Sequence, residues 1–143
     1  MRHYLNIFIS LFTLLLGIFA CSETGQNPSD VDITLPDSNL TYIDDMRPFF
    51  IAKCASRSGC HSFIDQEGGL HFNDYPSIRN HIVKTEFCNE PLVIPGDGDN
   101  SILYKILLID GECGLLRMPE DGPYLNQNNT NGVKIWIDEG LKQ

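Results

Sequence analysis

The sequence predicts an all-α domain of several short helices joined by long loops. Apolar residues repeat at helical spacing in short stretches, each beginning beside a capping residue or a proline. No stretch has the alternating apolar and polar pattern of a half-buried strand. With 143 residues, the chain has room for one small domain and a leader. Because much of the domain is loop, we expect a cofactor, disulfides or both to stabilise it.

The leader is predicted to be a signal peptide of residues 1–20. A basic start at Arg2 is followed by an uncharged, largely apolar run that is short for a membrane span. Residues 18–21, which end in Cys21, resemble the lipobox of bacterial lipoproteins. This resemblance implies that Cys21 carries lipid and anchors the chain to a bacterial membrane, and Ser22 is compatible with the outer membrane. The alternative is a secreted protein in which Cys21 is an ordinary thiol.

Residues 21–40 are predicted to form a flexible tether, because they are rich in Ser, Asp, Asn and Pro and lack apolar periodicity. The domain is then expected to cover residues 41–143. The formal net charge of −9 argues against nucleic acid and anionic lipid as partners. An acidic surface favours solubility and is compatible with a basic protein partner.

Two helices are expected in the first half of the domain. The first lies near residues 45–54, with Pro48 in its first turn and aromatic residues on its apolar face. The second covers residues 74–83, with Asn73 or Asp74 as its cap. A polar loop rich in glycine connects them.

Two more helices are expected in the second half. Dense turn residues at 95–100 precede a helix over residues 101–108, where apolar residues repeat at helical spacing. The last helix is expected over residues 133–139, with Asn131 as its cap and Trp136 on its apolar face.

A cysteine and histidine motif lies directly after the first predicted helix. Cys54 and Cys60 frame five residues, and His61 follows at once. A Cys-His pair just after another cysteine is the core of the c-type haem attachment signature, whose usual form has two residues between the cysteines. Lengthening the loop costs less than about 1 kcal/mol of closure entropy, and Gly59 can bend it outward. The spacing leaves open two thioethers, one through Cys60, or a disulfide between the two cysteines without haem.

Met118 is the candidate for a second axial ligand of a haem iron. Its thioether is a soft ligand that raises the potential, and it lies in a loop stiffened by a following proline. Arg117 beside it is a candidate partner for a haem carboxylate. His71 and His81 are alternative ligands without a supporting local pattern, and Met46 is expected in the core.

Taken in order, these motifs resemble the small c-type cytochrome domains of bacterial lipoproteins, related to the planctomycete-type cytochrome c domain. The similarity covers about residues 42–140. The matching segments are Met46 to Phe50, Gly59 to His61, Gly68 to Leu70, Val93 to Asp97 with Ser101 to Tyr104, Arg117 to Pro119, and Ile135 to Ile137 with Gly140.

The resemblance implies a cytochrome c-like fold around one covalently bound haem c. It implies that Cys54 and Cys60 tether the haem and that His61 and Met118 are its axial ligands. The remaining cysteines, Cys88 and Cys113, flank the turn and helix before the Met118 loop, where a disulfide would fix that loop to the domain.

The function expected from this set is single-electron transfer by a membrane-anchored mono-haem c-type cytochrome of the bacterial cell envelope. Its partners would be redox proteins in the periplasm or at the surface, and no enzymatic activity is expected. One alternative is a haem-free lipoprotein module stapled by disulfides. A small haem enzyme or gas sensor and a zinc site at Cys54, Cys60 and His61 are further alternatives; the zinc site lacks a fourth ligand at suitable spacing.

Overall fold

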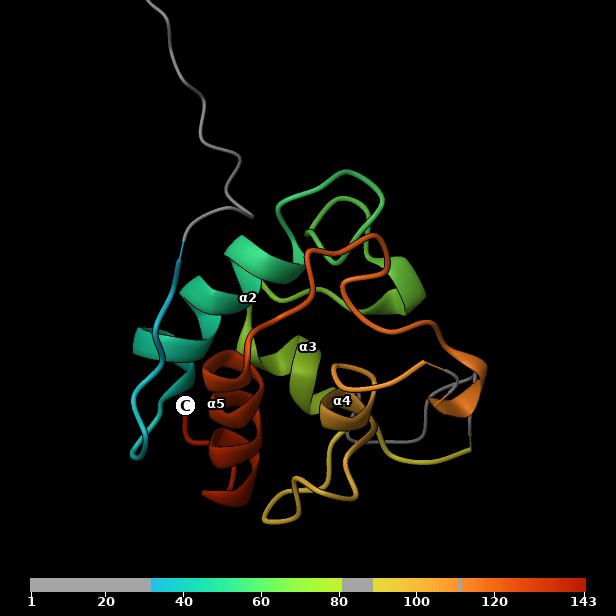
Figure 1. The fold of residues 1–143 in the computed structure, drawn as a ribbon. Helices are drawn as coiled ribbons and strands as arrows, with labels where there is room; N and C mark the ends of the chain where they lie inside the picture. Colours follow the sequence, from blue (N-terminus) through green and yellow to red (C-terminus); the bar gives the residue numbers. More distant parts are fainter. Residues whose placement is uncertain (1–31, 81–88, 111) are drawn as a thin grey trace, which may run out of the picture.

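The computed structural model describes residues 32–80, 89–110 and 112–143. This part of the chain is all-α and contains no β-strand, as the sequence predicted. Its α-helices are α2 (Arg47–Cys54), α3 (Tyr75–Asn80), α4 (Ile102–Lys105) and α5 (Gln127–Asp138) (Figure 1). Shorter helical turns are η2 (Tyr42–Met46), η3 (Glu67–Gly69) and η4 (Glu112–Gly114).

The expected signal peptide and the expected lipidation site Cys21 lie outside the described residues. None of the helices in the described part of the chain has the length and apolar character that crossing a bilayer requires. Attachment through a lipid on Cys21 stays a prediction.

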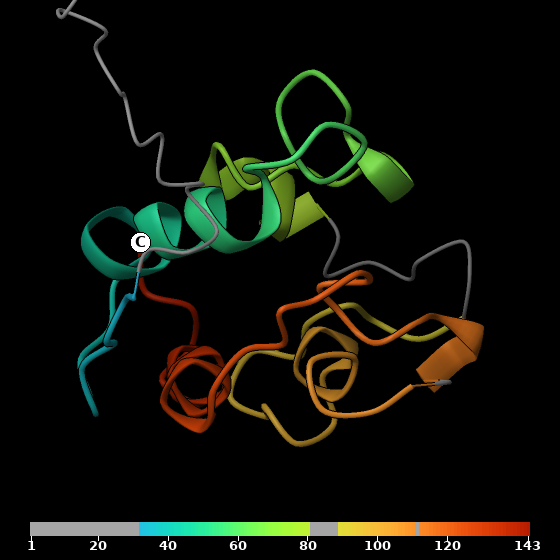
Figure 2. The same cartoon turned by 45° about the horizontal axis from the view of Figure 1, so that its top comes forward.

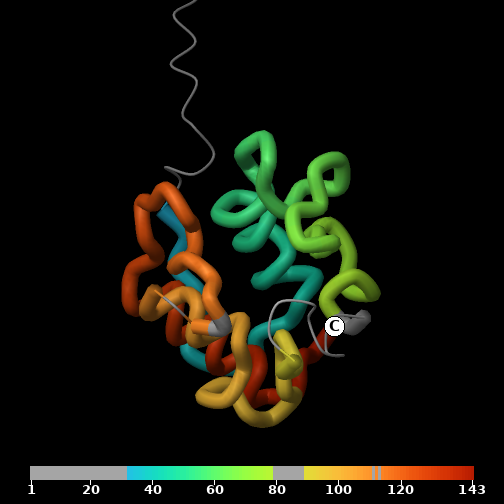
Figure 3. The backbone as a smooth tube through the Cα atoms, turned by 90° about the vertical axis from the view of Figure 1, so that its right-hand side faces the viewer, coloured from blue at the N-terminus to red at the C-terminus, as the bar shows by residue number. Residues whose placement is uncertain are grey.

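The described chain forms two halves. The first contains η2, α2 and α3, and the second contains α4 and α5 (Figures 2 and 3). Buried aromatic rings join them: Trp136 of α5 lies edge-on to Phe50 of α2, at 5.9 Å between ring centroids, and 6.1 Å from Tyr42. Phe50 stacks on Phe72 at 4.4 Å. Because such pairs stabilise beyond the area they bury, this aromatic cluster (Tyr42, Phe50, Phe72 and Trp136) fixes how the halves meet.

The predicted helices of the first half are confirmed within the described residues. α2 ends at Cys54, where the sequence placed its end. Asp74, and not Asn73, caps α3, because its carboxylate accepts a hydrogen bond of 2.9 Å from the Ser77 amide. The expected continuation of this helix to Val83 lies outside the described residues.

The last helix begins earlier than predicted. α5 starts at Gln127 and not at Val133, and Asn126 is its cap, accepting a hydrogen bond of 2.9 Å from the Asn129 amide. Asn131, the expected cap, lies inside the helix. The first turns are rich in asparagine and contain a glycine, which are poor helix formers. Helix propensity therefore did not indicate that these turns belong to the helix.

A strap of residues 33–35 holds these first turns from outside. The Asn128 side chain pairs with both backbone groups of Leu35, at 2.9 and 3.1 Å. Asn129 donates a hydrogen bond of 2.6 Å to the carbonyl of Ile33. The asparagines that weaken the helix therefore satisfy the backbone of the strap, which has no regular secondary structure of its own.

The strap also closes over the only glycine inside α5. Leu35 is 3% exposed, and a Cβ added at Gly132 would lie 2.8 Å from the Leu35 Cβ. The strap and the buried Leu40 belong to the packed domain, so the domain begins before the expected boundary at Thr41. The expected tether is correspondingly too long.

We expect Gly132→Ala to destabilise the domain by about 1–3 kcal/mol, the usual cost of overpacking. An alanine in an open helix would instead stabilise by roughly 0.5–1 kcal/mol, so the sign of the change tests the contact with Leu35. The measurement is urea unfolding. Asn131→Ala, at an exposed site one residue away, is the control and should not destabilise. A Gly132→Ala variant as stable as wild type would contradict the packed strap.

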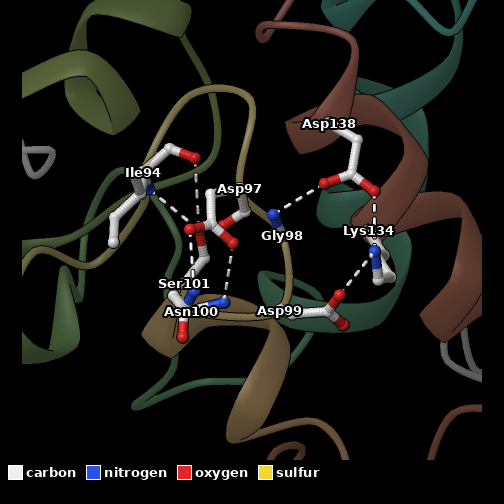
Figure 4. A network of polar contacts seen from close by, with 8 residues as sticks. All are labelled: Ile94, Asp97, Gly98, Asp99, Asn100, Ser101, Lys134 and Asp138. Carbon is white, nitrogen blue, oxygen red and sulfur yellow. Dashed lines mark hydrogen bonds and ion pairs between the residues drawn. The ribbon is translucent and has the colours of Figure 1, made fainter.

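A second tie connects α5 to the turn before α4 (Figure 4). The Asp138 carboxylate accepts hydrogen bonds of 2.7 Å from both the Gly98 amide and the Lys134 ammonium, and Lys134 also pairs with Asp99 at 3.2 Å. Burial acts to raise the pKa of Asp138, but the hydrogen bonds from Lys134 and Gly98 outweigh it and hold that pKa below its usual value. α4 itself is shorter than predicted and continues to Leu108 only as hydrogen-bonded turns.

Because the pKa of Asp138 is lower in the folded state, its contribution to stability is present above the ordinary carboxyl pKa of about 3.9 and is lost as the pH falls through the folded value. We expect Asp138→Asn to lower the free energy of unfolding by about 1 kcal/mol at pH 7 and to flatten its loss between pH 5 and about pH 2. Urea titrations across this range measure both effects. Asp99→Asn, whose side chain is 72% exposed, should change little. Equal acid dependence in Asp138→Asn and wild type would refute the assignment.

Candidate functional site

A cavity of about 890 Å³ lies between the two halves, within the size range of cofactor sites. The cysteine loop and the segment after it form one wall, and α4 and the loop around Met118 form the other. The cavity is mainly apolar, with a few chemically active groups. Those groups are Cys54, Cys60, His61 and Met118, and their apolar neighbours are Leu70, Phe72, Leu92, Leu103, Ile106, Leu107 and Leu115.

The long cysteine loop is closed by the backbone. The His61 amide donates a hydrogen bond of 3.1 Å to the carbonyl of Cys54, across the whole loop. Gly59 adopts a φ of +79°, a left-handed conformation that favours glycine, and so allows the chain to turn back. Both ends of the loop therefore meet, and both cysteines reach the same cavity.

The two cysteines are free thiols in this structure, and both are half-buried. Cys54 packs against the hydrophobic core at the end of α2. Burial, and secondarily the nearby Cys60 thiol, raise the pKa of Cys54 to about 12, against a smaller opposing effect of Lys53. Cys54 is therefore a protonated thiol at neutral pH.

The imidazole of His61 is oriented by backbone carbonyls. Its Nδ1 lies 3.1 Å from the Glu67 carbonyl oxygen and 3.3 Å from that of Leu70. Because a carbonyl only accepts, Nδ1 carries the proton, and the lone pair of the neutral ring is on Nε2. The ring also packs edge-on against Phe72, at 5.4 Å between centroids. A histidine held in this tautomer by a carbonyl is the usual arrangement of a metal ligand.

The side chains of Met118 and Arg117 lie in different places, and only Met118 lines the cavity. The Met118 amide donates a hydrogen bond of 2.8 Å to the Ile106 carbonyl, and Met118 lines the cavity. The Arg117 guanidinium lies over the Tyr124 ring at 4.0 Å and donates to the Leu107 carbonyl at 3.1 Å. Arg117 is not among the residues that line the cavity, so the structure does not bring it to the other site residues.

Two cations that the sequence analysis did not single out line the cavity, namely Lys53 and Arg57. Arg57 lies within the five residues between the cysteines, in the extra length of the loop. Its place between Cys54 and Cys60 could have indicated from the sequence that Arg57 lies near the cavity. The opposite wall contributes Glu120 and Asp121, so charges of both signs line the cavity.

The other candidates lie away from this site or outside the described chain. Cys88 and His81 fall in residues 81–88, which the structure does not describe, and the side chain of Cys113 is likewise not described; the expected disulfide stays a prediction. His71 pairs with Asp74 at 3.4 Å and does not line the cavity. Met46 is fully buried, and its expected place in the core is confirmed.

Within residues 32–80, 89–110 and 112–143, no three His, Cys, Asp or Glu side chains form a group that could hold a metal ion. A zinc site at Cys54, Cys60 and His61 would need such a group. A haem iron takes only one or two protein ligands in addition to the macrocycle, so this finding does not bear on haem.

Comparisons with protein-family models, with curated proteins and with solved structures find no significant match to this chain.

We expect nitrogen-15 NMR of the imidazoles to show His61 protonated on Nδ1 when it is neutral, because two carbonyls accept from that atom. His71 is the matched control, since its Nε2 faces the carboxylate of Asp74, and it should show the opposite tautomer. Long-range proton–nitrogen correlation spectra distinguish the two forms. A His61 ring protonated on Nε2 would show that Nδ1 does not have the carbonyl partners described above.

Proposed function

We propose that this chain is a mono-haem c-type cytochrome that carries single electrons. The observation that carries the proposal is that both thiols of the motif, His61 and the distant Met118 line one cavity. The closed backbone of the cysteine loop supports it, because this closure keeps Cys60 and His61 beside Cys54 despite the additional residues.

The residues present fit a haem. Cys54 and Cys60 are available as free thiols for thioether attachment, and the Nε2 lone pair of His61 and the Met118 sulfur would hold the iron. Bound haem c would supply a reversible one-electron couple. The apolar wall would exclude water, and Lys53 and Arg57 would place positive charge near the haem carboxylates or its exposed edge.

An electron carrier suits this site better than an enzyme. If His61 and Met118 both held the iron, no open position would remain for a substrate or gas. The expected lipid on Cys21 would hold the domain at a bacterial membrane, most simply the outer one, with the domain in the periplasm or at the surface. The net charge of −9 favours basic redox partners.

We expect the chain, produced with a c-type maturation system, to show the absorption bands of a ferrous c-type cytochrome and the added mass of one haem that survives denaturation. Cys60→Ala should lose most of this covalent haem, and Cys54→Ala should show whether the second thiol is used. Ser58→Ala, in the same loop, is the control and should keep full attachment.

Met118→Leu should keep the covalent haem but lower its potential and allow an added ligand such as imidazole to bind, because a filled position becomes open. A colourless chain whose mass is lower by two hydrogen atoms per cysteine pair would instead establish the haem-free, disulfide-stapled module, and the cytochrome proposal would fail.

A further inference from the structure

A hydrogen-bonded turn directly follows the proposed ligand His61. The hydroxyl of Ser62 accepts hydrogen bonds from the amides of Ile64 and Asp65, at 3.2 and 3.1 Å, and donates one of 2.7 Å to the Asp65 carboxylate. The Gln66 side-chain amide donates a hydrogen bond of 2.7 Å to the Phe63 carbonyl, and the Gln66 backbone amide donates one of 3.0 Å to the Ser62 carbonyl. These bonds close residues 62–66 into a turn, which we name the apolar turn.

The apolar turn presents two large hydrophobic side chains to solvent. Ile64 is 89% exposed, more than any other large hydrophobic residue in the described chain, and Phe63 is 63% exposed. One edge of Phe63 is supported by the ring of His71, at 5.4 Å between centroids. Neither residue lines the cavity, so a group bound in the cavity would leave both uncovered.

The charged residues of the turn and of the position after it have one sign. Asp65 lies within the turn and Glu67 follows it, while residues 62–67 contain no cation. The apolar pair is therefore followed in sequence by two acidic residues, Asp65 and the cavity-lining Glu67, on a chain that is itself strongly acidic. An exposed apolar pair beside acidic residues is typical of a protein docking site, and a complementary partner would have an apolar recess bordered by basic side chains.

We propose that the apolar turn is the docking surface for a redox protein with an apolar recess and basic border. This inference rests on the proposed function and names the place where the partner binds. Only Ser62 separates Phe63 from His61, so a partner seated on the turn would lie beside the residue that holds the iron. The acidic border disfavours the alternative occupant, an anionic membrane surface.

The first test uses tris(phenanthroline)ruthenium(II), an apolar cation that imitates the proposed partner surface. In nitrogen-15 NMR titrations of the mature chain, we expect saturable shift changes centred on residues 62–67. Ile64→Ser should weaken this binding about fivefold, the effect of losing a partly buried aliphatic contact. Ile43→Ser is the matched control, because Ile43 is 56% exposed on η2, and it should bind like wild type. Shift changes centred elsewhere, or equal binding by Ile64→Ser, would overturn the proposal.

The second test measures electron transfer by the haem-loaded chain. Ile64→Ser should slow oxidation by tris(phenanthroline)cobalt(III) by a similar factor and leave reduction by hexaammineruthenium(II), a cation without apolar ligands, unchanged. The titration needs no haem, so its result stands even where the spectrum and mass refute the cytochrome proposal. A flotation assay with phosphatidylglycerol-containing vesicles tests the membrane alternative in a chain that carries Cys21→Ser and therefore no lipid. If this chain floats with the vesicles and the addition of Ile64→Ser abolishes flotation, then the turn binds membrane and the docking proposal is wrong.

Discussion

The hydrogen bond from the His61 amide to the Cys54 carbonyl is the constraint on which the site depends. The five residues between the cysteines would otherwise be free to place Cys60 and His61 at many distances from the end of α2. With this bond made, the following amides complete a small framework, because Glu67 donates to the Cys60 carbonyl and Phe72 donates to that of His61. The same framework brings the carbonyls that orient the imidazole into reach.

This framework is coupled to the core through Phe72. Its ring packs against His61 on one side and stacks on Phe50 on the other, and Phe50 contacts Trp136 of the second half. The imidazole is thus connected through buried rings to α5, a helix of the second half. Loss of packing in the aromatic cluster would therefore change the position of the proposed ligand as well as the stability of the domain.

The sequence was sufficient for the helical class and for the end of α2 at Cys54, because both follow from periodicity. The motifs also pointed to four side chains that line the cavity, namely Cys54, Cys60, His61 and Met118. The start of α5 was missed because its asparagines stabilise it through contacts with the strap, distant in sequence, which propensity does not register. The place of Arg117 was missed for a similar reason. A guanidinium beside Met118 has several partners within reach, and only the fold determines that it lies on Tyr124.

The strap has a mechanical consequence for a chain held at a membrane through Cys21, as proposed. Residues 33–35 are fastened to α5, so at most residues 21–32 remain to span the distance from the lipid to the domain. At about 3.3–3.6 Å per extended residue, these can reach roughly 40 Å, against roughly 70 Å for a tether that continued to residue 40. The strap would therefore shorten the tether and limit the domain to partners close to the bilayer. It would also determine that the face of the domain beside the first turns of α5 is the one attached to the membrane.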